Sequence, residues 1–194
     1  MCIRDRIWII DPIDGTTNFS HSFAPYCVSI ALWDRTELVL GLVYELAHKQ
    51  CFYATKGQGA YLDGSVLSVS PCTQPEDSLI ATGFPYTEFS RVHSFLTLLK
   101  VLFQETHGVR RAGAASYDLC AVAAGWVEGF FEEGLKAWDV AAGGFIVQEA
   151  GGYICDWEGG NQWLTGKQII AGNKPIKKYL LERIQGIYPG FGST

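Results

Sequence analysis

Two carboxylates stand three residues apart near the start of the chain, in residues 8–20, WIIDPIDGTTNFS. An apolar run before Asp11 predicts a buried strand, and Pro12 is expected to end it at Asp11 because proline cannot donate to a ladder. Asp14 falls in the following turn, so the two carboxylates can converge on one point. Hard divalent cations such as Mg²⁺ match these oxygen ligands, and the Ile13 carbonyl is a natural further ligand.

The residues that follow have the composition of an anion site. Gly15 permits a close approach of the backbone, and GTTN at 15–18 predicts a first helical turn whose free N–H groups suit phosphate. A cation cluster beside a helix N-terminus is the apparatus of phosphate-ester hydrolysis. An isolated DxxDG is more often a capped turn, because Asp and Gly populate turns in any protein.

A third carboxylate, Asp139, opens the segment WDVAAGG at 138–144. Considered alone, Asp139 is more often a helix cap than a metal ligand, since Asp is favoured in a first turn. Considered with Asp11 and Asp14, it completes a candidate metal site, and the small residues at 141–144 would let the helix approach closely.

Composition limits the classes of function. A chain of 194 residues, 48% hydrophobic and 18% charged, predicts one domain over residues 1–194. The formal charge of −5 and the isolated basic pairs at 110–111 and 177–178 argue against a nucleic-acid partner. No apolar run reaches the ~20 residues that a membrane span requires, and no signal peptide is evident. Six cysteines without a CxxC pair favour free thiols. We therefore expect a cytoplasmic protein with no membrane partner.

The elements that must position the acidic residues change character along the chain. Residues 8–85 predict mainly antiparallel strands, and residues 86–194 predict a mixed α/β portion. Helices are expected at 92–104, at 116–128 with Ser116 as N-cap, at 138–152 and at 175–185. The fold class expected is α+β, built from layered sheets and helices.

Two long segments resemble a known family. WIIDPIDGTTNF at 8–19 and WDVAAGGFIVQEAGG at 138–152 resemble the two signature segments of the inositol monophosphatase family, within the Mg²⁺-dependent, lithium-sensitive phosphatase superfamily. KGQGAYLDG, GFPY and RRAGAASYDLCAVAAGWVEGFFE are also similar, so the resemblance covers nearly the whole chain. It implies a layered αβαβα sandwich that is commonly a homodimer.

The resemblance also implies a segment upstream of the first motif. The family normally has helices there and a strand that carries a metal-binding Glu. No Glu occurs before Glu37 in this chain. We therefore expect an incomplete phosphatase domain that lacks the N-terminal helices and first strands.

Metal-binding roles follow from the resemblance by matching position. Asp11 would bridge two Mg²⁺ ions, and the Ile13 carbonyl would bind one of them. Asp14 and Asp139 would hold the second. Ile13, Asp14 and Asp139 would also border the bound ester.

Phosphate and alcohol recognition are implied in the same way. The N–H groups of Gly15 and Thr16 would receive the phosphate, and the Thr16 hydroxyl would orient the attacking water, which makes Thr16 and Asp11 the catalytic candidates. Glu132 matches a carboxylate that binds sugar-like hydroxyls, although a solvated strand-end charge is equally compatible with its position, and its neighbour Glu133 would be a surface residue. The alcohol would be lined by three residues of GAAS: Gly113, Ala114 and Ala115.

The expected function is Mg²⁺-dependent hydrolysis of a polyol phosphate monoester, most simply myo-inositol 1-phosphate, by metal-activated water. Within the superfamily, histidinol-phosphate, fructose-bisphosphate and nucleotide phosphatases remain alternatives, because the alcohol pocket sets the choice. A non-catalytic relative or fragment that binds metal, substrate or a protein partner is the alternative from a different class.

Overall fold

The computed structural model describes residues 6–85, 89–188 and 190–191. Its first sheet is an antiparallel meander of six strands in chain order. The strands are β1 (Arg6–Asp14), β2 (Cys27–Asp34), β3 (Glu37–Glu45), β4 (Gln50–Thr55), β5 (Ala60–Leu62) and β6 (Ser65–Val66). Tight turns between strands rich in β-branched and aromatic residues favour this local pairing, as the sequence predicts.

A second sheet contains the remaining strands in the order β10-β11-β9-β7-β8. The strands are β7 (Leu79–Thr82), β8 (Gly108–Arg110), β9 (Gly129–Glu133), β10 (Tyr153–Cys155) and β11 (Gln168–Gly172). Strand β7 pairs in parallel with β8 and β9, whereas the other pairs are antiparallel. Parallel neighbours need crossover connections, which the helices of the second half of the chain provide.

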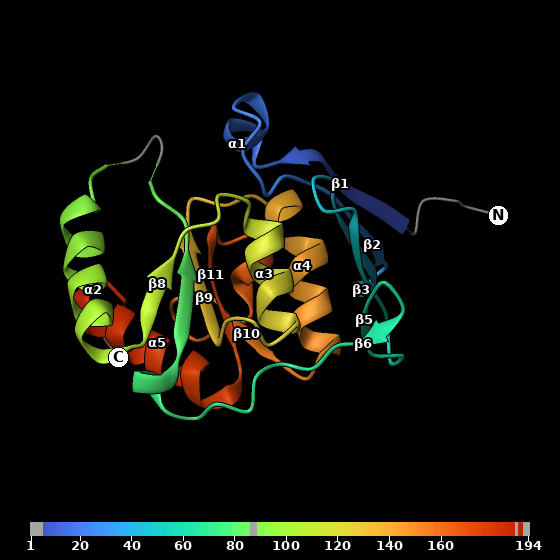
Figure 1. The fold of residues 1–194 in the computed structure, drawn as a ribbon. Helices are drawn as coiled ribbons and strands as arrows, with labels where there is room; N and C mark the ends of the chain where they lie inside the picture. The colour runs from blue at the N-terminus through green and yellow to red at the C-terminus, as the bar shows by residue number, and fades with distance from the viewer. Residues whose placement is uncertain (1–5, 86–88, 189, 192–194) are drawn as a thin grey trace.

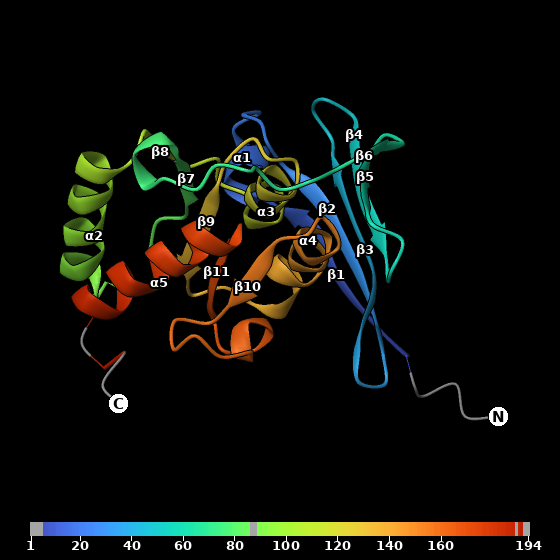
Figure 2. The same cartoon turned by 90° about the horizontal axis from the view of Figure 1, so that it is seen from below.

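Two helices lie between the sheets and two lie outside the second sheet (Figures 1 and 2). The inner pair is α3 (Ala115–Ala123) and α4 (Ala137–Glu149), and the outer pair is α2 (Val92–Glu105) and α5 (Lys174–Ile187). Three short helices are α1 (Thr16–Ser20), η1 (Pro75–Asp77) and η2 (Gln162–Leu164). The described residues thus form four alternating layers of sheet and helix, which confirms the α+β layered fold.

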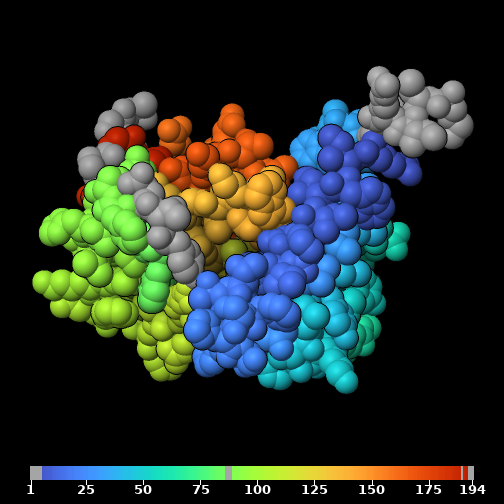
Figure 3. Space-filling view, turned by 90° about the horizontal axis from the view of Figure 1, so that it is seen from above, coloured from blue at the N-terminus to red at the C-terminus, as the bar shows by residue number. Residues whose placement is uncertain are grey.

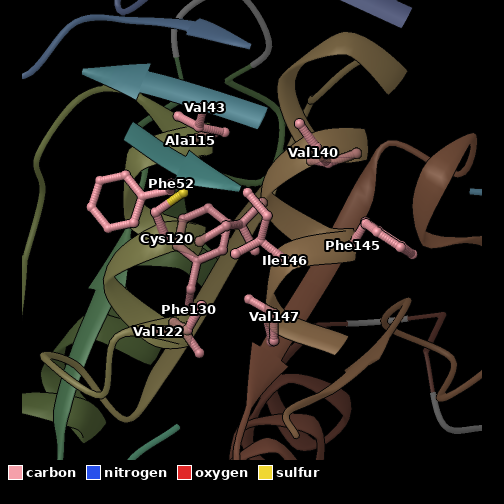
Figure 4. Close-up of a cluster of buried hydrophobic side chains, with 14 of the residues drawn as sticks. Val43, Phe52, Ala115, Cys120, Val122, Phe130, Val140, Phe145, Ile146 and Val147 are labelled. Carbon is pink, nitrogen blue, oxygen red and sulfur yellow. The ribbon is translucent and has the colours of Figure 1, made fainter. Parts of the chain in front are cut away.

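The main hydrophobic core lies where α3 and α4 meet the first sheet (Figure 4). Residues 140–147 of α4 are all buried, so this helix is apolar on every side. The two helices approach closely because α4 carries glycine at the contact. A Cβ on Gly143 would lie 2.7 Å from the Leu119 Cβ of α3. The small residues therefore act as predicted and bring α4 close to its neighbours.

A second core stabilises the other face of the second sheet. Helices α2 and α5 are amphipathic, and their buried residues pack on Ile80, Phe131 and Ile170 of the sheet. No helix in the described part of the chain combines the length and apolarity needed to cross a membrane.

Two local expectations are wrong. Strand β1 does not end at Asp11 but continues to Asp14, because a bulge at residues 12–13 shifts the register between the Asp11–Ser29 and Asp14–Cys27 pairs. Helix α3 is not capped by Ser116: it begins at Ala115 after an Ala114 N-cap, and the Ser116 side chain bonds elsewhere. The helix also ends at Ala123, earlier than expected, and the left-handed Gly125 follows its C-cap Ala124.

The outer face of the first sheet is apolar. Leu32 pairs with Trp8 and Leu40, and Leu42 pairs with Ile30 and Tyr53. Trp8 is 58% exposed, and the others in this row are partly exposed, because no described element packs on them. A continuous apolar surface of this kind favours association.

We expect this surface to bind a hydrophobic dye and to drive concentration-dependent self-association. Replacing Leu32 and Leu42 together by Thr should lower both effects and keep a cooperative melt, because Thr suits strands but is less apolar. Dye fluorescence and light scattering measure this. The control is Phe103→Thr, which removes an exposed ring from α2. A wild-type chain that is monodisperse and binds no dye would contradict the expectation.

Candidate metal and phosphate site

The three acidic residues singled out in the sequence meet at one end of the inner helices. Asp11 and Asp14 come from the end of β1, and Asp139 comes from the first turn of α4. One carboxylate oxygen of each lies within 4.8 Å of those of the other two. Figure 3 shows the blue N-terminal segment beside the gold segment that opens α4, although the two are far apart in the sequence.

Each carboxylate is oriented by an N–H donor. The Ile13 N–H donates to Asp11 Oδ1 at 3.0 Å, and the Lys136 N–H donates to Asp139 Oδ2 at 2.6 Å. Ser116 donates to Asp14 Oδ2 twice, from its N–H at 2.8 Å and from its hydroxyl at 2.6 Å. Asp139 therefore does cap α4, as its position alone suggests, and is at the same time one of the three carboxylates of the cluster.

The cluster is electrostatically costly without a cation. Burial raises the pKa of Asp14 to about 6, the bonds from Ser116 oppose this rise, and the nearby Asp139 and Asp11 charges add to it. Burial also raises the pKa of Asp139, and the Asp11 charge contributes. Three hard oxygen ligands that are partly desolvated and repel one another fit a divalent cation, and oxygen-only ligand sets suit Mg²⁺.

The turn after Asp14 places a helix start beside the cluster. Gly15 is the N-cap of α1 with φ of 81°, a conformation that favours glycine. Its environment leaves little room, because a Cβ there would lie 3.1 Å from the Ala114 Cβ and 3.2 Å from the Gly113 carbonyl oxygen. Gly15 thus packs directly on the backbone before α3, and the exposed Thr16 follows it.

A cavity of ≈ 600 Å³ begins at the carboxylates and extends along the end of the second sheet. Asp14, Asp139, Gly15 and Thr16 line it at one end. Four other residues predicted for the site also line it: Gly113, Ala114, Ala115 and Glu132. The structure therefore brings these eight predicted residues to one cavity, while Asp11 and Ile13 approach it from β1.

Glu132 lines this cavity from the end of β9 and is partly buried. Burial raises its pKa well above the usual range, and the carboxylates of Asp118 and Asp14 add to the rise. Its carboxylate lies over the backbone of Gly83: a Cβ on Gly83 would fall 2.0 Å from the carboxylate carbon. Glu132 is therefore not a solvated strand-end charge.

Glu133 is not the surface residue expected from the sequence. It lines the same cavity, forms a 2.7 Å ion pair with Arg91 and accepts a hydrogen bond from Gln168 at 3.3 Å. Because β9 is the central strand of its sheet, both carboxylates at its end face neighbouring structure rather than open solvent. Arg91, Arg111, Lys136 and Lys167 add positive charge to the lining, which suits an anionic ligand.

Sequence reasoning missed the residues that hold the site together. Buried Asn18 of α1 donates at 2.8 Å to both the Pro25 and Ala112 carbonyls and so joins three segments. Ser116 binds Asp14 from a distance of 102 residues in the chain. The available signal for Ser116 was a polar residue at the start of an apolar helix, and it was interpreted as an N-cap.

Comparison with known proteins gives concordant results. A model described as the inositol monophosphatase family matches residues 3–187. The chain is 45% identical to "Putative Nus factor SuhB" of Neisseria meningitidis serogroup A over 91% of this chain and 68% of that protein. It is 39% identical to "Inositol-1-monophosphatase" of Mesorhizobium japonicum, over 92% and 67%. The crystal structure of extragenic suppressor protein suhB from Bartonella henselae superposes with a TM-score of 0.91 at 40% identity, over 94% and 71%.

We expect Mg²⁺ to stabilise the wild-type chain, and Asp139→Asn to remove most of this effect, because an amide cannot neutralise a cation. At a hundredfold excess over Kd, ligand binding contributes about 2.7 kcal/mol. That corresponds to a rise in Tm of roughly 5–10 °C in a chain of this size. Thermal melts with Mg²⁺ and with a chelator measure the shift.

The control for this experiment is Asp77→Asn, the same change at an exposed residue of η1. It should leave the Mg²⁺ shift intact. An unchanged shift in Asp139→Asn would mean that Asp139 serves only as the helix cap.

Proposed function

The chain belongs to the inositol monophosphatase family, and on that basis we propose that it hydrolyses a phosphate monoester of a polyol, most simply myo-inositol 1-phosphate, with Mg²⁺ as cofactor. The observation that carries this proposal is the placement of three convergent carboxylates beside the start of α1, at one end of a cavity that also contains Glu132. Such an arrangement suits a ligand with a phosphate at one end and hydroxyl groups at the other.

Each part of the ester has candidate partners on this chain. Asp11, Asp14 and Asp139, with the Ile13 carbonyl, would hold divalent cations. When bound, such ions neutralise the phosphate ester and activate water for attack. The first N–H groups of a helix have no partner within it, so those of Gly15 and Thr16 are suited to bind phosphate oxygens.

The alcohol would lie against the backbone of residues 113–115 and beside Glu132. The raised pKa of Glu132 keeps its carboxyl group protonated to a higher pH than usual. A protonated carboxyl group donates as well as accepts hydrogen bonds, and a polyol offers both kinds of partner. The Thr16 hydroxyl, which lines the cavity at the phosphate end, would orient the attacking water.

The finer properties that we propose follow the family: lithium sensitivity, a homodimer and a cytoplasmic location. The negative formal charge of the chain supports the view that its ligand is a small phosphate ester rather than a nucleic acid.

A second candidate function is binding of metal and ester without turnover. One observation favours it: the Neisseria relative bears the name of a Nus factor rather than a phosphatase. Binding and turnover must therefore be measured separately.

The direct test is phosphate release from myo-inositol 1-phosphate. We expect release in Mg²⁺ and none with a chelator, and slower release from histidinol phosphate, fructose bisphosphate and a nucleotide monophosphate. Calorimetric titration with the same ester in Mg²⁺ measures binding. Binding without release would overturn the enzymatic proposal in favour of the second candidate, and the absence of both would overturn both.

Glu132→Ala should weaken recognition of the polyol while leaving the Mg²⁺ shift in Tm intact, because it removes both the donor and the acceptor of the carboxyl group. A neutral hydrogen bond contributes about 0.5–1.5 kcal/mol, so each bond lost corresponds to a rise in KM of roughly 2- to 10-fold. Gly83→Ala should have the same effect, because its methyl group would displace the Glu132 carboxylate.

The control is Glu182→Ala on the exposed side of α5, which should leave KM unchanged. Equal KM values for Gly83→Ala and the wild-type chain would show that the position of the Glu132 carboxylate does not matter for recognition.

A further inference from the structure

The three carboxylates share one feature: one oxygen of each accepts a hydrogen bond from an N–H donor. Asp11 uses Oδ1 and Asp139 uses Oδ2 to accept from the backbone. Asp14 uses Oδ2 to accept from Ser116. A carboxylate oxygen has two lone pairs, so only Asp14 Oδ2, which accepts two bonds, has both of them used, whereas the engaged oxygens of Asp11 and Asp139 accept one bond each.

Asp14 is held more firmly than the other two. The N–H and the hydroxyl of one residue, Ser116, both donate to the same oxygen, at 2.8 and 2.6 Å. Ser116 is fully buried, and Asp14 is only 8% exposed, so water does not compete for these bonds. The α3 backbone fixes the direction of the donors, and Asp14 cannot rotate to present both oxygens without breaking both bonds.

The number of oxygens that a carboxylate offers affects which cation it suits. Ca²⁺ takes six to eight ligands at about 2.3–2.6 Å and often binds both oxygens of one carboxylate. Mg²⁺ demands near-octahedral geometry at about 2.0–2.1 Å and binds through fewer carboxylate oxygens. A carboxylate that is restricted to one oxygen, as Asp14 is, is therefore better matched to Mg²⁺ than to Ca²⁺.

We propose that Ser116 is a positioning residue that restricts Asp14 to one-oxygen coordination and thereby makes the site prefer Mg²⁺ to Ca²⁺. This inference rests on the proposed function, because it assumes that the cluster holds a divalent cation. Ser116 does not touch the cation itself. It acts by occupying Asp14 Oδ2 with hydrogen bonds, so that the cation can bind only the other oxygen of Asp14.

The positioning role can be tested because a substitution can remove the Ser116 hydroxyl. The donors to Asp11 and Asp139 are backbone N–H groups, which a side-chain substitution does not remove. Ser116→Ala deletes the shorter of the two bonds to Asp14 and keeps the N–H bond. One lone pair of Asp14 Oδ2 then becomes available to a large cation that accepts both oxygens.

The experiment measures the Kd of Mg²⁺ and of Ca²⁺ by calorimetric titration of the full chain. In Ser116→Ala, the ratio of the Ca²⁺ Kd to the Mg²⁺ Kd should fall about tenfold, since one hydrogen bond to a charged group is lost. Ser116→Cys, whose thiol is a weak donor, should behave like Ser116→Ala. Ser116→Thr keeps the hydroxyl and should keep the wild-type ratio.

The matched control is Ser78→Ala. Ser78 is also fully buried, and its hydroxyl donates at 2.6 Å to the Pro75 carbonyl, away from the carboxylates. Its loss should not alter the ratio of the two Kd values. A general loss of stability would weaken the binding of both cations alike. The ratio of the two Kd values therefore separates a positioning role from a structural one.

The outcomes distinguish this inference from the proposed function. If the wild-type chain binds neither cation, the metal-dependent function is wrong. If the wild-type chain binds Mg²⁺ but Ser116→Ala keeps the same ratio, the positioning role is wrong and the function stands. If Ser116→Ala does not fold, the contrast between Ser116→Cys and Ser116→Thr decides the question, and equal ratios in those two variants would overturn the inference.

Discussion

The contact between Asp14 and Ser116 joins the two halves of the site, and much of the local structure depends on it. Asp14 ends the first strand, whereas Ser116 lies in the first turn of α3, 102 residues further along the chain. A buried carboxylate without partners would be costly, and two hydrogen bonds offset part of that cost. The same contact brings the turn at Gly15 against the Gly113 backbone, where phosphate and alcohol recognition would meet.

The layered architecture makes this meeting possible. Helices α3 and α4 lie between two sheets, and both begin at the end of the molecule where β1 ends (Figure 1). Their first turns therefore present Ser116 and Asp139 to the same place. The close packing of the helices, which small residues such as Gly143 permit, limits how far these first turns can move apart. The rigid core thus determines the spacing of charges that repel one another.

The sequence predicted most elements because their signals are local. Runs of residues that suit strands indicated the meander, and a long segment of small and apolar residues ending in glycine indicated α4. The errors occur where a residue far away in the chain determines the local structure. Pro12 was expected to end β1, but pairing of Asp14 with Cys27 resumes after a bulge. Glu133 was expected at the surface, but an ion pair with Arg91 holds it in the cavity. Neither partner can be identified from residues nearby in the chain.

The sequence by itself determined the family, the layered α+β fold and the identity of the three acidic residues, since these depend on residue type, order and spacing. Only the tertiary structure decided how those residues are held: which oxygen of each carboxylate is engaged, that Ser116 supports Asp14 instead of capping its own helix, and that Gly83 leaves room for Glu132. The physical reason is that hydrogen-bond direction and desolvation depend on contacts between segments far apart in the chain.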